Sequence, residues 1–223
     1  MAKTLSHGSK AVAVMGLGRF GGSVALSLSR MGHEVLGIDE SPSIVQHWAD
    51  RLTHVVEADA TSTETLCRLG VHEFEHAVVG VGNDVEASVL TVLALSELEI
   101  PDIWAKAISD QHGRILEKTG AHHVVYPEAA MGRRVAHLVT GKMIDFIEFD
   151  DGFAIVKTQA PEEATGKTLA ASSLRSKYGI TIVGVKRLQE DFTYATPDTL
   201  VETGDLLIVS GPTKMVEEFA AIT

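Results

Sequence analysis

Hydrophobic residues in the first 140 positions fall into short runs that alternate with segments of helical periodicity. Six runs have the length and composition of buried strands: residues 10–18, 33–39, 53–59, 76–82, 103–109 and 122–127. A segment with helical spacing follows each run. This alternation predicts an α/β domain with a parallel sheet covered on both faces. Right-handed crossovers then give a Rossmann-like, doubly wound fold with strand order 3-2-1-4-5-6.

Two of the predicted helices carry specific start signals. Ser41 is followed by Pro42, which is typical of an N-cap and the first helical position. Thr61 and Glu64 have the spacing of a capping box for a helix at residues 62–70. Each of these helices is therefore expected to begin directly after its strand.

After Gly141 the hydrophobic pattern changes to a period of two. Residues 143–161 alternate around Asp151-Gly152, which predicts a β-hairpin. One short helix, three strands and a final helix are predicted next, at residues 168–179, 180–188, 192–197, 205–211 and 213–222. The chain is therefore expected to form two domains, residues 1–141 and residues 142–223, of which the second is a small C-terminal α+β lobe.

Three glycines follow the first strand and open the next helix. Gly16, Gly18 and Gly21 form G-x-G-x-x-G: the first permits a tight turn, the second admits a pyrophosphate, and the third lets helix pack on strand. Asp39 ends the second strand, where a carboxylate can accept both ribose hydroxyls and repels the 2′-phosphate of NADP. Asp59 ends the third strand, either as an adenine or ribose contact or as a helix N-cap. The pattern predicts a nucleotide site; the alternative is that the glycines serve packing alone.

Composition narrows the classes of partner. The chain has 30 acidic and 19 basic residues and a net charge of −11, which disfavours nucleic acid. No apolar run reaches the ~18–20 residues of a membrane span, and the N-terminal MAKTLSHGSK is too polar for a secretory signal. The single cysteine, Cys67, fits the reducing cytosol and is expected to be a small buried hydrophobe. We expect a cytoplasmic protein that reaches a membrane only through a partner.

Two pairs of histidines imitate metal sites. His72 and His76 spell H-E-x-x-H, but a helix ends at Gly70 and a strand follows, so both cannot lie on one helix face. His122 and His123 are adjacent on a predicted strand and point to opposite faces. Neither pair predicts a metal centre.

Catalytic motifs do not accompany the predicted nucleotide site. None of the three tyrosines has a lysine four residues later, no G-x-S-x-G motif occurs, and the second lobe is too small to be the usual substrate domain of a dehydrogenase. We expect a nucleotide-binding protein and not an enzyme; a small NAD-dependent oxidoreductase is the alternative.

Several motifs together resemble a known family. They are GLGRFG with Asp39, VGVGNDVEASVLTVLA, WAKA followed by His112, and YPEAAMG with a small trailing lobe. From about Ala11 to the C-terminus, the chain resembles the cytosolic regulatory subunits of Trk/Ktr potassium-uptake systems. These are RCK proteins, with an N-terminal nucleotide-binding lobe and a C-terminal RCK_C lobe.

The resemblance implies a partner and a mechanism. Family members form homodimers that commonly assemble into an octameric ring beneath a membrane-embedded potassium channel or transporter subunit. Nucleotide in the cleft changes the shape of the ring and gates the pore. The Ktr type senses ATP against ADP, whereas the Trk type often uses NAD or NADH. For this chain, Arg19 and Glu128 favour ATP and ADP, with NAD or NADH as the alternative. The resemblance places the protein at the inner face of the cell membrane, bound through the channel subunit.

The resemblance also implies a set of nucleotide-binding residues. Arg19 would reach phosphate, and Glu128 would place a divalent cation, Mg²⁺ or Ca²⁺, beside the γ-phosphate; alternatively, Glu128 is only a charge that favours the dipole of its helix. The full set is Gly16, Gly18, Arg19, Phe20, Gly21, Asp39, Glu40, Ser41, Asp59, Ala60, Val81, Gly82, Asn83, Lys106, Ala107, Ile108, His112 and Glu128.

Some relatives bind cyclic di-AMP at the interface between their C-terminal lobes. The matching positions are Leu169, Leu174, Arg175, Thr181, Ile182 and Pro197. Thr181 stands where the family pattern has asparagine, and the leucines equally suit simple packing of the lobe. Cyclic di-AMP is therefore a second expected ligand, with packing as the alternative.

Overall fold

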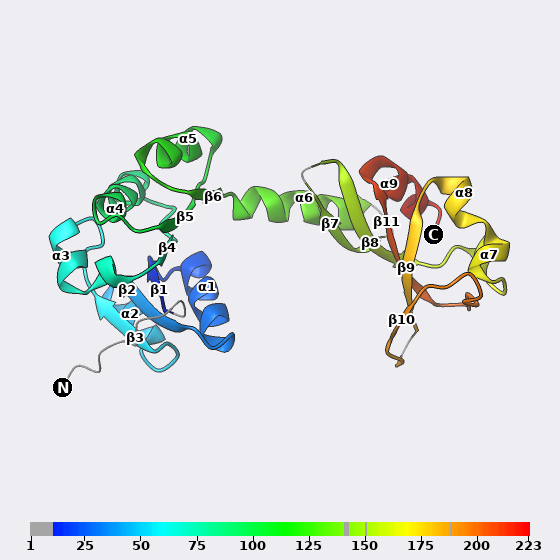
Figure 1. The fold of residues 1–223 in the computed structure, drawn as a ribbon, viewed down its shortest axis with the longest axis horizontal. Helices are drawn as coiled ribbons and strands as arrows, with labels where there is room; N and C mark the ends of the chain where they lie inside the picture. The colour runs from blue at the N-terminus through cyan, green and yellow to red at the C-terminus, as the bar shows by residue number, and fades with distance from the viewer. Residues whose placement is uncertain (1–10, 141–142, 150, 188) are drawn as a thin grey trace. The chain divides into compact units, whose positions relative to one another are not determined.

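The computed structural model describes residues 11–140, 143–149, 151–187 and 189–223. The chain forms two compact units, which divide between Glu128 and Ala129 (Figure 1). Helix α6 (Pro127–Thr140) begins just before this division and continues past it. The predicted domain boundary, between residues 141 and 142, falls on residues outside those described.

The first unit is built on a six-stranded parallel sheet (Figure 1). Its order, β3-β2-β1-β4-β5-β6, confirms the predicted topology. The strands are β1 (Ala11–Met15), β2 (Glu34–Asp39), β3 (His54–Glu57), β4 (His76–Val79), β5 (Asp102–Lys106) and β6 (His123–Val125). Because parallel strands end at the same edge of a sheet, the loops that follow them gather the predicted nucleotide residues along that edge.

Helices cover both faces of this sheet. They are α1 (Arg19–Arg30), α2 (Pro42–Trp48), α3 (Thr63–Arg68), the 3₁₀ turn η1 (Val71–Glu73), α4 (Val85–Glu97) and α5 (Asp110–Thr119). Val14 packs in one core with Ala25 of α1 and Trp48 of α2. Met15 packs in the other core with a buried leucine from each of α3, α4 and α5: Leu66, Leu95 and Leu116. Alternate β1 side chains thus enter separate cores, as expected for a strand buried on both faces.

Of the two predicted helix starts, one is confirmed and the other is wrong. Ser41 is the N-cap of α2, with proline in its first turn. The N-cap of α3 is Ser62, whose hydroxyl accepts the N–H of Thr65 at 3.2 Å. Thr61 instead donates its hydroxyl to the carboxylate of Asp59 at 2.7 Å, so neither of these two residues caps the helix. The local Asp59–Thr61 bond outcompetes the predicted capping box.

The second unit is built on a five-stranded antiparallel sheet of order β10-β9-β11-β8-β7. Its strands are β7 (Met143–Glu148), β8 (Phe153–Gln159), β9 (Thr181–Lys186), β10 (Phe192–Tyr194) and β11 (Leu206–Pro212). Antiparallel pairing of β7 with β8 confirms the predicted hairpin. Gly152 in its turn has a φ of +76°, a value that glycine adopts without steric cost.

The short helix predicted at residues 168–179 forms as two helices. They are α7 (Leu169–Ser172) and α8 (Leu174–Tyr178), separated by Ser173 with a left-handed φ of +55°. The 3₁₀ turn η2 (Glu162–Ala164) precedes them, and α9 (Thr213–Ala221) follows β11. One residue in the left-handed region is enough to end a helical hydrogen-bond ladder.

A separate core stabilises the second unit. Leu174 of α8, Val209 of β11 and Phe219 of α9 are buried in it. The ring of Phe219 is fully buried and meets the ring of Tyr178 edge-on, with 5.3 Å between centroids. Among the described residues, the members of this core are distinct from those of the two cores of the first unit.

Separate cores predict separable effects of core mutations. Phe219→Ala removes a buried ring and should destabilise the second unit by about 3–5 kcal/mol. Both tryptophans of the chain, Trp48 and Trp104, lie in the first unit, so tryptophan fluorescence reports unfolding of that unit alone. In urea, the variant should unfold earlier by far-ultraviolet circular dichroism with an unchanged fluorescence midpoint.

The matched control for this experiment is Met215→Ala, on the same helix but 41% exposed. It should change stability by less than about 0.5 kcal/mol. An equal shift of the fluorescence midpoint in Phe219→Ala would contradict the independence of the two units.

Candidate nucleotide-binding site

Two of the three predicted glycines lie where backbone segments approach too closely to leave room for a side chain. Gly16 has a φ of +81°, and a Cβ on it would lie 2.8 Å from Cγ2 of Val81. A Cβ on Gly21 would lie 1.9 Å from the carbonyl oxygen of Gly16 and 3.5 Å from Cα of Gly80. The turn after β1, the start of α1 and the end of β4 therefore meet without side chains between them.

Gly18 is different, because a Cβ there would meet no atom of the described residues within 4 Å. It is the N-cap of α1, and no side chain of the residues that the structure describes caps this helix. The backbone at the start of α1 thus faces open space, as anion binding at a helix N-terminus requires.

Asp39 ties the glycine turn to the end of β2. Its Oδ2 accepts the N–H of Leu17 at 2.7 Å, and its Oδ1 accepts the N–H of Ser41 at 2.9 Å. The carboxylate is 9% exposed, and each oxygen keeps a lone pair for a further donor such as a ribose hydroxyl. The sequence predicted a ligand contact here and missed this structural role.

A buried lysine forms the centre of the site. Lys106 ends β5, and its Nζ donates to Oε1 of Glu128 at 2.6 Å. The same Nζ lies 5.9 Å from the centroid of the Phe20 ring, and a Cβ on Gly82 would come within 3.0 Å of it. The hydrogen bond from Lys106 holds the pKa of Glu128 below its ordinary value, and the charge of Arg19 acts in the same direction. Four predicted residues and this lysine therefore lie together.

His112 supplies a buried polar atom without a partner. It lies in the first turn of α5, where Nδ1 accepts the N–H of Ile108 at 3.4 Å, and burial lowers its pKa. The neutral ring therefore carries its proton on Nε2, which is buried and has no hydrogen-bond partner among the described residues. Such a donor suits an oxygen of a ligand.

The remaining predicted residues follow strand ends at the same edge. Asp59 and Ala60 follow β3, where Thr61 donates two hydrogen bonds to Asp59 and lowers its pKa. Exposed Glu40 follows β2, half-buried Val81 and exposed Asn83 follow β4, and buried Ala107 follows β5. These residues therefore share a sheet edge with Lys106.

Positions predicted for cyclic di-AMP have mixed surroundings. Leu174 is buried in the core of the second unit, and Leu169 and Ile182 pack against that core. Arg175 and Thr181 are exposed, as is Pro197, whose carbonyl accepts the N–H of Ala170 at 2.9 Å. The leucines fit the packing alternative, and binding of cyclic di-AMP stays a prediction.

The histidine motif and the cysteine have different outcomes. His72 lies in η1, a single 3₁₀ turn, and His76 begins β4, so the expectation that they share no helix face is confirmed. Among the residues that the structure describes, no group of three His, Cys, Asp or Glu side chains is placed to hold a metal ion. Cys67 is exposed, so its predicted burial is wrong; the buried position of that turn belongs to its neighbour Leu66.

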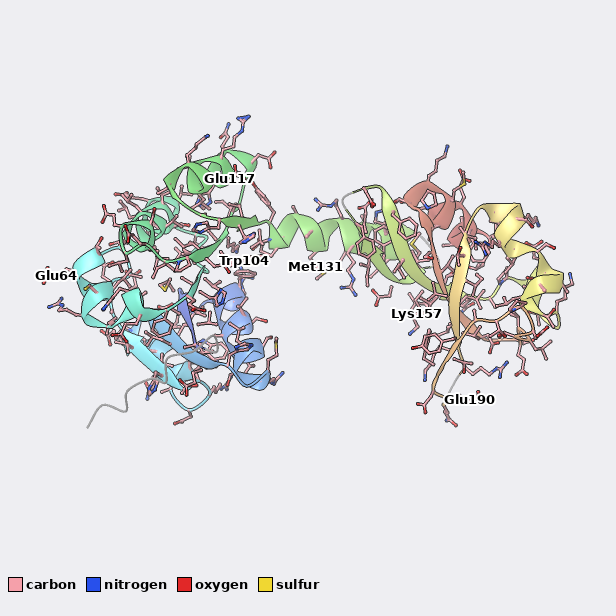
Figure 2. All side chains as sticks on the ribbon, in the orientation of Figure 1. Glu64, Trp104, Glu117, Met131, Lys157 and Glu190 are labelled. Carbon is pink, nitrogen blue, oxygen red and sulfur yellow. The ribbon has the colours of Figure 1, made fainter. Side chains whose placement is uncertain are left out.

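Sequence reasoning missed a side-chain cluster at the opposite edge of the sheet. Asp102 begins β5, and its carboxylate lies 2.9 Å from Nδ1 of His76 and 3.3 Å from Nε2 of His123. Trp104, labelled in Figure 2, donates to the same carboxylate at 3.0 Å and stacks on His123. Partial burial would raise the pKa of Asp102, but the hydrogen bonds from His76 and Trp104 outweigh it and hold that pKa below its ordinary value. Cross-strand register, which pairs His76 with Asp102, was the missing signal.

Comparison with known proteins identifies the class of protein. Residues 12–127 match the TrkA-N domain and residues 153–223 match the TrkA-C domain. The whole chain superposes on the RCK domain of GsuK with a TM-score of 0.67 at 18% identity, covering 98% of this chain and 48% of that one. A GsuK channel bound to NAD gives a TM-score of 0.65 at 18% identity, over 97% of this chain and 40% of that one. The fold is therefore that of an RCK protein.

A closer relative identifies the family. The chain is 37% identical over 212 residues to Ktr system potassium uptake protein A of Bacillus subtilis, which covers 95% of this chain and 96% of that protein. The chain therefore belongs to the Trk/Ktr family of potassium-uptake regulatory subunits. In the described part of the chain, no helix is both long enough and apolar enough to span a bilayer.

The glycine contacts predict opposite effects of the same substitution at two helical sites. Gly21→Ala places a methyl group against a backbone oxygen and should cost about 3 kcal/mol, seen as a lower tryptophan-fluorescence midpoint in urea. Gly132→Ala, on α6 in the second unit, where an added Cβ would meet no described residue within 4 Å, should leave that midpoint unchanged and should add up to about 1 kcal/mol to its own helix, seen by far-ultraviolet circular dichroism. A Gly21→Ala protein as stable as wild type would contradict the packing role.

Proposed function

We propose that this chain is the nucleotide-sensing regulatory subunit of a potassium-uptake system, with ATP and ADP as its ligands. The observation that carries the proposal is the combination of an uncapped helix start at Gly18 with buried Lys106 beside it at the same sheet edge. Open N–H groups and a buried cation are the two features that phosphate requires. The name of the Bacillus relative, a potassium uptake protein, supports the transport role.

The phosphates, the ribose and a cation bound to the nucleotide each have a residue of suitable chemistry. The start of α1, Arg19 and Lys106 would bind phosphates, and Asp39 would accept ribose hydroxyls with its remaining lone pairs. The Nε2–H of His112 would donate to a ligand oxygen. Glu128 would contribute a carboxylate to Mg²⁺ or Ca²⁺, which prefer oxygen ligands and would neutralise charge between the carboxylate and the γ-phosphate.

Regulation would come from a difference in affinity between two states of an assembly. A ligand shifts such an equilibrium only as far as it binds one state better than the other. ATP and ADP differ in the γ-phosphate, so Arg19 and Glu128 would supply the difference. In this proposal, homodimers of the chain assemble into an octameric ring, which acts at the inner face of the membrane on a membrane-embedded potassium channel or transporter subunit.

NAD or NADH is the second candidate ligand. The GsuK channel bound to NAD, a protein of the same fold, favours it, and so does the carboxylate at the end of β2. Mass spectrometry of the nucleotide retained on purification, followed by competition between ATP, ADP, NAD and NADH, separates the two. Turnover of NAD in a dehydrogenase screen would revive an oxidoreductase role.

The proposal predicts a selective effect of Arg19→Ala. The variant should lose about tenfold in affinity for ATP and much less for ADP, because the guanidinium would contact the γ-phosphate. Calorimetric titration with ATP, ADP and adenosine measures this. Arg30→Ala, at the last turn of the same helix, removes the same charge outside the site and should leave all three affinities unchanged.

If Arg19→Ala lowers the affinities for ATP and ADP equally, this arginine does not distinguish the two ligands by contacting the γ-phosphate. Binding of none of the adenine nucleotides by the wild-type chain would overturn the function itself.

A further inference from the structure

The Lys106–Glu128 pair is strongly asymmetric in its surroundings. The lysine side chain is 11% exposed, whereas the glutamate side chain is 65% exposed. Lys106 ends a central strand, and its amine lies 5.9 Å from the centroid of the Phe20 ring and 3.0 Å from the place that a Cβ on Gly82 would take. The lysine is therefore held in place by its surroundings, and Glu128 is the member that is free to move.

The Glu128 carboxylate also occupies the position at which another anion would bind the Lys106 amine. Oε1 of Glu128 accepts from Nζ at 2.6 Å, the short distance of a charge-assisted hydrogen bond. A phosphate oxygen that bound Lys106 would need the same donor. Because a buried amine offers few open directions, carboxylate and phosphate would compete for it.

We infer that Glu128 is an internal competitor of nucleotide phosphate, which closes the site by neutralising Lys106 until a ligand displaces it. This inference rests on the proposed function and adds a regulation to the same site. It assigns Glu128 a role in the protein without ligand, where no cation takes part.

Competition between Glu128 and phosphate for Lys106 makes the affinity for a nucleotide depend on whether a divalent cation accompanies it. Phosphate without a cation must break the Lys106–Glu128 hydrogen bond and leave a displaced carboxylate near a second anion, which is repulsive. A divalent cation would accept the displaced carboxylate and remove both costs. Glu128 thereby disfavours nucleotide without a cation and lets nucleotide with a cation bind.

The alternative is that Lys106 and Glu128 form a fixed ion pair whose only role is to anchor the start of α6 to β5. Such an anchor would make Glu128→Gln neutral or harmful to ligand binding. Competition predicts the opposite sign, because glutamine keeps the shape of the side chain and an acceptor oxygen but loses the charge that opposes phosphate.

The test is calorimetric titration of the full chain with ADP in EDTA, where neither a γ-phosphate nor a divalent cation is present. Glu128→Gln should bind ADP about tenfold tighter than wild type, since one charge-assisted hydrogen bond to the carboxylate no longer has to be broken. Glu128→Ala, at an exposed position, should show the same direction and serves if the glutamine variant folds poorly.

The matched control is Glu163→Gln in the second unit. Glu163 also accepts hydrogen bonds from a lysine, Lys177, and from Tyr178, so its substitution removes the same charge from a similar pair outside the site. It should leave ADP affinity unchanged. An equal gain in this control would assign the effect to net charge and overturn the inference.

Two failures remain distinct. If wild type binds ADP and both Glu128 variants bind it no tighter in EDTA, the competitor role is wrong and the proposed function stands. If no protein binds ADP or ATP even with Mg²⁺, the proposed function fails, and the competitor role fails with it.

Discussion

The fold of the first unit depends on a steric constraint, the contact of bare backbone where β1, α1 and β4 meet. A methyl group on Gly21 would lie 1.9 Å from the Gly16 carbonyl oxygen, and one on Gly80 would lie 2.7 Å from the same atom. These contacts fix the direction in which α1 leaves the sheet. Asp39 completes the arrangement, because its two bonds to backbone N–H groups hold the turn against the end of β2. The open start of α1 therefore follows from this backbone packing and does not depend on a bound ligand.

Two cationic side chains and one anionic side chain lie close to that turn. Arg19 and Lys106 are cationic, and Glu128 balances one of them in the structure. A chain with a net charge of −11 repels polyanions on average, so a local positive field must come from such fixed groups near the binding edge. The burial of Lys106 makes its charge count for more than an exposed lysine would.

Sequence patterns predicted the topology of both units because hydrophobic periodicity and strand length are local properties. The order of six strands follows from right-handed crossovers and needs no side-chain detail. The sequence predictions were wrong where the backbone conformation or the position of a single residue decides the local structure. Ser173 adopts a left-handed φ of +55° and splits a predicted helix, and Cys67 lies one position away from the buried face that Leu66 occupies.

Pairings between distant residues were the other limit of sequence reasoning. Lys106 and Glu128 were both expected at the nucleotide site, yet their mutual bond depends on how α5 returns the chain to β6, which no local pattern encodes. The cluster around Asp102 depends likewise on strand register. The family resemblance predicted which residues belong to the site, and the structure shows which of these residues contact one another, such as Lys106 and Glu128.

The solvent-exposed thiol of Cys67 has a practical consequence. Since the chain has a single cysteine, one maleimide dye or spin label per subunit attaches at a defined point on α3 without mutagenesis. In a symmetric homo-oligomer, every label would occupy an equivalent position. The distribution of label-to-label distances would then give the number of subunits and test whether the proposed ring changes its geometry with the proposed nucleotide.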